Sequence, residues 1–439
     1  MRRTKLQRVA CLLLCFFLLA CGGTFAVGAQ DLTATSSATG NNNVTDKSIE
    51  DYRRELGSIT YSEYMREFSS YENATDTVVL DAIGSLDSEG TTLRYLTDDE
   101  WAQITQNSTL ASSIVGIYET EYDGVKALYT PGSGTVSFRA KGVKEGLYSI
   151  RIVYYPVEGK AASIEREFYI NGTTPFKESR TLTLPKLWQN VYTSAEIRLS
   201  TKQNAQELLD AAKTVGVNAT SEVRDDGTYM IVNIPDVWTQ GVSEYFNTLT
   251  KKSAAIRFFT TDKEDNELRP ATKQTPEWLV CDLRDNEGQY AESFQYVITP
   301  DKNGDVLLTL KGVNEPMAIS QIMLIPHDTL PTYDSYINKY KNAPLGESTI
   351  KIEAEYPSQL STNTVYPTED RASAATSPAD TSRTVLNTIG GEKWGTAGQS
   401  ISYRFRVDKT GLYSIDMRFR QNVLDGQFVS RSLSLYSDG

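Results

Sequence analysis

Histidine and cysteine are scarce in this chain of 439 residues. His327 is the single histidine, which argues against catalytic triads, facial-triad iron sites and histidine-rich zinc sites. Cys11, Cys15 and Cys21 lie near the N-terminus, and only Cys281 lies further along. Without a disulfide framework the domains must be held by buried apolar cores. We expect Cys281, which has apolar neighbours, to be a strand residue rather than a nucleophile.

Clusters of basic residues and catalytic motifs are also missing. The chain has 44 Lys and Arg against 56 Asp and Glu, a formal net charge of −12, and no basic cluster follows residue 10. Nucleic acid is therefore not an expected partner, since its binding depends on neutralised phosphates. No Gly-x-Ser-x-Gly, phosphate-binding loop or run of zinc ligands occurs, and we expect no enzymatic activity.

The longest apolar run lies at the N-terminus, where residues 1–8 are basic and residues 9–20 apolar. This pattern predicts an export signal within residues 1–29. Leu18-Leu19-Ala20-Cys21-Gly22 resembles a lipobox, in which Cys21 would be lipidated, whereas Val27-Gly28-Ala29 favours ordinary signal-peptidase cleavage. An uncleaved anchor is the third alternative. All three predict an extracellular or cell-surface protein, attached to the membrane if it is a lipoprotein.

An internal repeat follows the Ser/Thr/Asn/Gly-rich residues 30–48, which we interpret as a flexible linker. Residues 60–64 and 332–336 both read Thr-Tyr-x-x-Tyr, and Gly-Leu-Tyr-Ser-Ile occurs at residues 146–150 and again at 411–415. The order of the matches is kept and their offsets differ by only a few residues. The sequence therefore predicts a duplicated domain.

The repeated unit has the pattern of antiparallel β-structure. Residues 136–140, 147–155 and 164–170 alternate apolar and polar side chains and are separated by Gly-containing turns. We predict a mainly β protein with tandem antiparallel β-sandwich domains of the jelly-roll type. The expected parts are a first sandwich at 49–330, a small α/β insertion within it at about 195–260, a linker helix at 331–348, and a second, incomplete sandwich at 349–439.

Several segments between residue 140 and the end resemble a family of large extracellular proteins of Gram-positive bacteria. In that family two carbohydrate-binding-module-like sandwiches precede the solute-binding domain of a sugar ABC transporter. The matching segments are residues 154–160, 163–166, 267–270, 276–278, 315–319, 386–391 and 419–422. The resemblance implies an ABC transporter permease as a partner, although residues 195–260 depart from the family pattern and the solute-binding domain is absent.

The sandwiches themselves are similar to carbohydrate-binding modules of families 6 and 35, which have the galactose-binding-like fold. The similarity lies in Ile352-Glu353-Ala354-Glu355 and in Trp394 ahead of residues 399–403. In those modules the opening acidic pair helps to hold a structural calcium ion, which implies that Glu353 and Glu355 are calcium ligands here. We expect residues 352–355 to form a strand, in which the two side chains, being two residues apart, point to the same face. The first copy keeps Asp81 but has Ile83 in the second place, so its site would be weaker or missing.

Aromatic and planar polar side chains are the candidates for sugar recognition, since a pyranose ring stacks on an indole and its hydroxyls need hydrogen-bonding partners. Trp188 follows a loop-like stretch and Trp394 lies in a Gly-rich loop; each could instead fill a sandwich core. Arg420 and Asn422 could bind hydroxyls, or could lie on a solvated strand face.

The function expected from the sequence is a non-catalytic extracellular protein that binds a polysaccharide or oligosaccharide, the front part of a sugar-uptake binding protein. The alternative is a structural or adhesive cell-surface spacer that binds no glycan.

Overall fold

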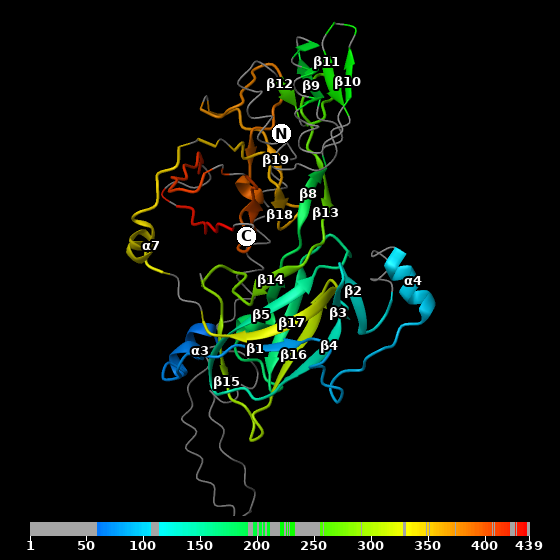
Figure 1. Cartoon of the computed structure of the whole chain (residues 1–439), viewed down its shortest axis with the longest axis vertical. Helices are drawn as coiled ribbons and strands as arrows, with labels where there is room; N and C mark the ends of the chain where they lie inside the picture. Colours follow the sequence, from blue (N-terminus) through cyan, green and yellow to red (C-terminus); the bar gives the residue numbers. More distant parts are fainter. Residues whose placement is uncertain are drawn as a thin grey trace, which may run out of the picture. The chain divides into compact units, whose positions relative to one another are not determined.

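The protein is mainly β, and its sheets are antiparallel (Figure 1). The computed structural model describes residues 59–106, 114–191 and 259–436, with short gaps at 291, 328–330, 348, 351, 374, 406, 408, 422–425 and 427, and separate stretches between 196 and 257. The predicted signal, Cys21 and the linker lie outside these residues.

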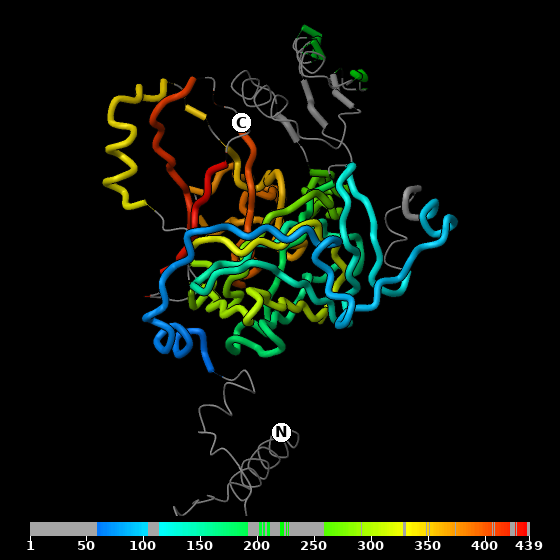
Figure 2. Tube along the Cα trace, turned by 60° about the horizontal axis from the view of Figure 1, so that its bottom comes forward, coloured from blue at the N-terminus to red at the C-terminus, as the bar shows by residue number. Residues whose placement is uncertain are grey.

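Two sheets form the first sandwich. The larger has seven strands in the order β14-β5-β17-β3-β2, with β1 beside β17 and β15 beside β5. Its strands are β1 (Val78–Asp81), β2 (Tyr118–Tyr122), β3 (Val125–Thr130), β5 (Gly146–Tyr155), β14 (Leu279–Asp282), β15 (Gln295–Ile298) and β17 (Met317–Ile325). Figure 2 shows β1, in blue, running beside the yellow-green β17.

The smaller sheet has the order β4-β16-β6-β7. Its strands are β4 (Gly134–Ala140), β6 (Ile164–Ile170), β7 (Leu182–Leu184) and β16 (Val306–Asn314). The predicted strands at 136–140, 147–155 and 164–170 are confirmed as β4, β5 and β6. Cys281 lies in β14 as expected, and burial raises the pKa of its thiol to about 12, which keeps the sulfur protonated.

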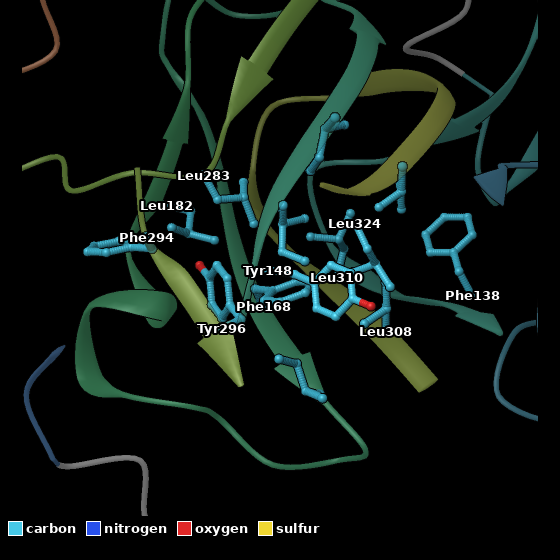
Figure 3. Packing of buried hydrophobic residues seen from close by; sticks show 14 of the residues in the cluster. Phe138, Tyr148, Phe168, Leu182, Leu283, Phe294, Tyr296, Leu308, Leu310 and Leu324 are labelled. Atoms are coloured by element: carbon cyan, nitrogen blue, oxygen red, sulfur yellow. The ribbon is translucent and has the colours of Figure 1, made fainter. Parts of the chain in front are cut away.

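The core lies between these two sheets (Figure 3). Strand β6 alternates buried and half-buried residues along its whole length, as a strand with one face on a core must. Phe168 from the smaller sheet packs edge-on against Tyr296 of β15, with ring centroids 5.2 Å apart. A continuous apolar layer contributed by both sheets therefore confirms the predicted sandwich.

The strands between β7 and β14 in the sequence belong to two further sheets. Strands β8 (Trp188–Val191) and β13 (Ala271–Gln274) pair with each other, and the segment between them contains a separate four-stranded sheet. Its strands are β9 (Glu196–Leu199), β10 (Thr220–Val223), β11 (Tyr229–Val232) and β12 (Ala255–Arg257). The described residues thus place strands within the predicted α/β insertion at 195–260, where residues 202, 203, 205, 206, 209 and 210 are helical.

The C-terminal segment adds short strands to the β8–β13 pair. Strand β18 (Gln359–Leu360) pairs with β8 through Leu360 and Trp188, and β21 (Ile401–Ser402) pairs with β18. The other elements are α3 (Tyr61–Glu67), α4 (Asp98–Gln106), α7 (Tyr333–Tyr340), β19 (Pro367–Thr368), β20 (Thr388–Ile389) and the 3-10 turns η2 (Lys177–Arg180) and η3 (Gly391–Lys393). Helix α7 lies within the predicted linker helix at 331–348.

The duplication is visible in the hydrogen bonds. Thr60 and Thr332 cap α3 and α7, each accepting a hydrogen bond from the backbone N–H three residues later. Tyr148 donates its hydroxyl to the carbonyl of Lys144, and Tyr413 donates in the same way to Lys409. Equal side chains therefore make equal contacts in the two copies, 272 residues apart for the threonines and 265 for the tyrosines.

Two expectations for the second copy were wrong. Residues 352–355 were expected to be a strand, but the segment turns there, with the N–H of Tyr356 bonded to the carbonyl of Glu353. Residues 411–415, the counterpart of β5, are not a strand either, although their sequence is identical to that of residues 146–150. Strand formation requires a pairing partner as well as a suitable sequence.

Candidate functional site

Trp188 lies in strand β8, in contrast to the loop expected from the sequence. The side chains of Trp188 and Asn190 are buried, whereas that of Gln189 between them is half-buried. Only 8% of the Trp188 surface is exposed. It packs against Leu360 and Val365 of the C-terminal segment, which are also buried. Trp188 therefore joins the first sandwich to the C-terminal segment and presents no open indole face in this structure.

Trp394 follows η3 and packs on the edge of the same apolar cluster. Its indole N–H donates to the carbonyl oxygen of Gln399 at 2.9 Å, which fixes the ring orientation. Gly390 has a φ of 101°, and a Cβ at that position would lie 3.2 Å from the indole Cε3. The glycine thus allows both the turn and the close approach of the ring. The two predicted tryptophans are brought together, with Trp188 buried and Trp394 half-buried.

Arg431 was missed by the sequence analysis, because nothing in the local pattern connects it with a residue 37 positions earlier. Its guanidinium carbon lies 4.5 Å from the centre of the Trp394 ring, a cation–π distance. Its Nη2 donates to the Trp394 carbonyl oxygen at 2.8 Å. The side chain of Gln399 lies close by, donating to Thr364 Oγ1 and accepting from the Thr396 N–H. An indole, a guanidinium and an amide therefore meet at one exposed loop.

Arg420 belongs to a different network. Its Nη1 donates to both carboxylate oxygens of Asp370, at 2.8 and 2.6 Å. The Thr376 hydroxyl and the Ala372 N–H also donate to this carboxylate, and together with Arg420 they lower its pKa. Arg420 is thus engaged in holding the loop at 370–376, and Asn422 lies outside the described residues.

We predict that this loop loosens in acid. The pKa of Asp370 is depressed in the folded protein, so its hydrogen bonds and ion pair stabilise the loop above roughly pH 4. This stabilisation is lost as the pH falls through the pKa of the folded state. The amide of Ala372 should therefore lose protection from hydrogen exchange below that pH, after correction for intrinsic rates. Asp370→Asn should remove this step, and identical profiles for the two proteins would show that Asp370 is not responsible.

Glu353 and Glu355 do not share the face of a strand, since they lie at a turn. Glu355 is buried and Glu353 is half-buried. Calcium needs about six to eight oxygen ligands, and in the described part of the chain no group of three or more His, Cys, Asp or Glu side chains could hold a metal ion. The prediction of a calcium site therefore rests on the sequence resemblance alone.

The sequence analysis also missed a series of hydrogen bonds that connects a serine, a histidine and a glutamate. Nδ1 of His327 lies 3.0 Å from Oγ of Ser149, and its Nε2 lies 3.1 Å from the Glu292 carboxylate. The residue types are those of a hydrolytic triad, but the ring nitrogens are exchanged, because Nδ1 rather than Nε2 faces the serine. Ser149 is also 1% exposed in β5 and is flanked by strands β15 and β17. Because a substrate carbonyl cannot reach this hydroxyl, we assign the chain of hydrogen bonds to holding the segment after β17 against β5.

Comparison with protein-family models and with curated proteins finds no match to this chain. Within the described residues, none of the helices has the length and apolarity that crossing a bilayer requires. The resemblance to sugar-transport proteins and carbohydrate-binding modules therefore stays a prediction from the sequence.

Proposed function

We propose that this protein is a non-catalytic, extracellular carbohydrate-binding protein whose sugar platform is Trp394. The observation that supports this most directly is the half-buried indole, fixed through Gln399 and with the Arg431 guanidinium over its ring. An aromatic face stacks on the C–H surface of a sugar ring, and a guanidinium donates to its hydroxyls in a planar geometry.

A role in sugar uptake, as a partner of an ABC transporter permease, forms part of this proposal through the sequence resemblance. Localisation outside the cytoplasm is proposed from the export signal in residues 1–29. The uptake role and the localisation do not depend on the geometry around Trp394. Both proposals would stand if another residue bound the sugar.

Three contacts favour the alternative, a structural or adhesive spacer. Trp188 is buried between strands of the two copies, and Arg269 stacks on Tyr366 with its guanidinium carbon 3.3 Å from the ring centre. The backbone N–H of Leu386 also donates to the carboxylate of Glu267 at 2.7 Å. Contacts of this kind would hold a rigid rod as well as they would support a binding loop.

Affinity electrophoresis in gels containing soluble polysaccharides distinguishes the two functions. We expect the unmutated protein to be retarded by at least one polysaccharide, and Trp394→Ala to weaken the apparent affinity about tenfold or more, because the stacking surface is removed. Trp188 is unsuitable for this test, since truncating a buried side chain would disturb the fold.

Tyr95→Ala is the matched control, because Tyr95 is an 83% exposed aromatic residue of the first sandwich. It should be retarded as strongly as the unmutated protein, and all three proteins should have similar melting temperatures. No retardation of the unmutated protein by any polysaccharide tested would favour the spacer function.

A further inference from the structure

Asparagine is followed by glycine at two places in the chain, and both asparagines are exposed in turns of the first sandwich. Asn171-Gly172 forms the turn after β6, and Asn303-Gly304 lies in the turn between β15 and β16. An asparagine amide that precedes glycine is open to attack by the next backbone nitrogen, because glycine has no side chain to block the approach. The two turns differ in how firmly they hold this amide.

Asn171 is held by both its side chain and its backbone. Its Oδ1 accepts from the Leu307 N–H at 2.9 Å, and its Nδ2 donates to the Thr299 carbonyl oxygen at 3.3 Å. Its own N–H donates to the Leu307 carbonyl oxygen at 2.8 Å. Across the turn, Ile170 and Thr173 exchange backbone hydrogen bonds of 2.9 and 3.0 Å. The side-chain carbon of Asn171 therefore cannot approach the following nitrogen without the loss of several hydrogen bonds.

Asn303 has a free side chain on a turn that is held by one exposed residue. Its side-chain amide makes no hydrogen bond with the described residues. The carboxylate of Asp301 accepts from the Asn303 N–H at 2.7 Å, and the carbonyl oxygen of Asp301 accepts from the Gly304 N–H at 2.9 Å. Only the second of these bonds has to open before the Gly304 nitrogen can react with the side chain of Asn303.

We propose that Asn303 is a modification site, at which the folded protein converts asparagine into aspartate and isoaspartate without an enzyme. The Gly304 nitrogen gives its proton to hydroxide and forms a bond to Cγ of Asn303. The side-chain nitrogen takes up a proton from water and leaves as ammonia. Water then opens the resulting succinimide ring at either of its carbonyl groups, which leaves aspartate or isoaspartate at position 303. The reaction needs water alone, and nothing is oxidised or reduced.

The modification also affects a neighbouring turn. The Gly304 carbonyl oxygen accepts from the Val143 N–H at 2.9 Å, which links the modified turn to the one ahead of β5. Isoaspartate inserts a methylene group into the backbone and displaces this carbonyl. Either product adds a carboxylate close to Asp301 and Asp305, which repel it. The Val143 amide should therefore lose protection from hydrogen exchange as the protein ages.

Peptide mapping by mass spectrometry tests the proposal on the full chain after ageing in a mildly alkaline buffer. We expect the peptide with Asn303 to be modified about tenfold or more faster than the peptide with Asn171, because side-chain hydrogen bonds restrain Asn171 alone. In denaturing urea the two peptides should react at similar rates, since glycine follows both. Modification of Asn171 as fast as Asn303 in the folded protein would overturn the proposal. So would an Asn303 that reacts in urea but stays intact in the folded protein.

Asn303→Gln is the matched control, because glutamine must close a larger ring and reacts far more slowly. After the same ageing, the Val143 amide of this variant should keep its protection, whereas the modified fraction of the unmutated protein should lose it. Unchanged exchange at Val143 in unmutated protein that is fully converted at position 303 would refute the effect on the neighbouring turn.

Discussion

Replacing Lys186 by methionine is expected to lower the free energy of unfolding by about 3–5 kcal/mol, because it leaves a buried carboxylate without its partner. Nζ of Lys186 lies 2.6 Å from Oε2 of Glu315, and both side chains are 1% exposed. Nζ also donates to the carbonyl oxygen of Lys160 at 3.1 Å. Glu315 lies between β16 and β17 with a φ of 57°, so the pair fixes the connection between the smaller sheet and the larger one.

Arg166 is a second buried cation close to this ion pair. Its guanidinium is buried and donates to the carbonyl oxygens of Asn314 and Glu315 at 2.8 and 2.9 Å. Burial lowers the pKa of Arg166 to about 10, which leaves it charged at neutral pH. Two cations therefore face one carboxylate in the core, and Arg166 alone replaces only part of the interaction that Lys186 makes.

Urea denaturation followed by tryptophan fluorescence measures the effect. Lys144→Met is the matched control, since it removes an ion pair with Asp76 whose side chains are 77% and 51% exposed. That change should cost no more than about 1 kcal/mol. Combining Lys186→Met with Glu315→Gln should recover part of the loss. Equal losses for Lys186→Met and Lys144→Met would mean that the pair does not determine stability.

The sequence predicted the first sandwich well because each of its strands carries its own signal. Alternation along β6 and the Gly-containing turns around β5 are local features, and local features can be read without knowledge of partners. The Lys186–Glu315 pair could not be predicted, since 129 residues separate its members. Glu315 lies in one of the segments that support the family resemblance, residues 315–319, but that segment indicates a family and not a contact.

The candidate site was predicted less completely, for the same physical reason. A Gly-rich loop around Trp394 is a local signal, whereas the position of Arg431 over its ring depends on the path of the chain between them. Trp188 was expected in a loop because Pro185 precedes it by three residues, yet pairing with β13 and β18 makes it a strand residue. At such positions, pairing with strands distant in the sequence outweighs a local loop signal such as a nearby proline.

Truncation of Trp188 to alanine is expected to release the C-terminal segment from the first sandwich. The indole fills the space between β8 and β18, so its loss removes buried apolar area and leaves a cavity, at a cost of about 3–5 kcal/mol. The amides of β18 and β21 should then lose protection from hydrogen exchange, while those of β5 and β17 keep theirs. Limited proteolysis should cleave first within residues 341–358.

Trp278→Ala separates this local effect from a general loss of stability. Trp278 is a half-buried tryptophan of the first sandwich that packs edge-on against Tyr155 and donates its indole N–H to the Tyr122 carbonyl oxygen. Its removal should destabilise the sheet that carries β2 and β5 without selective exchange in β18 and β21. If Trp188→Ala instead left β18 and β21 as protected as in the unmutated protein, the two copies would be joined through Arg269 and Glu267, and the indole would be dispensable for that junction.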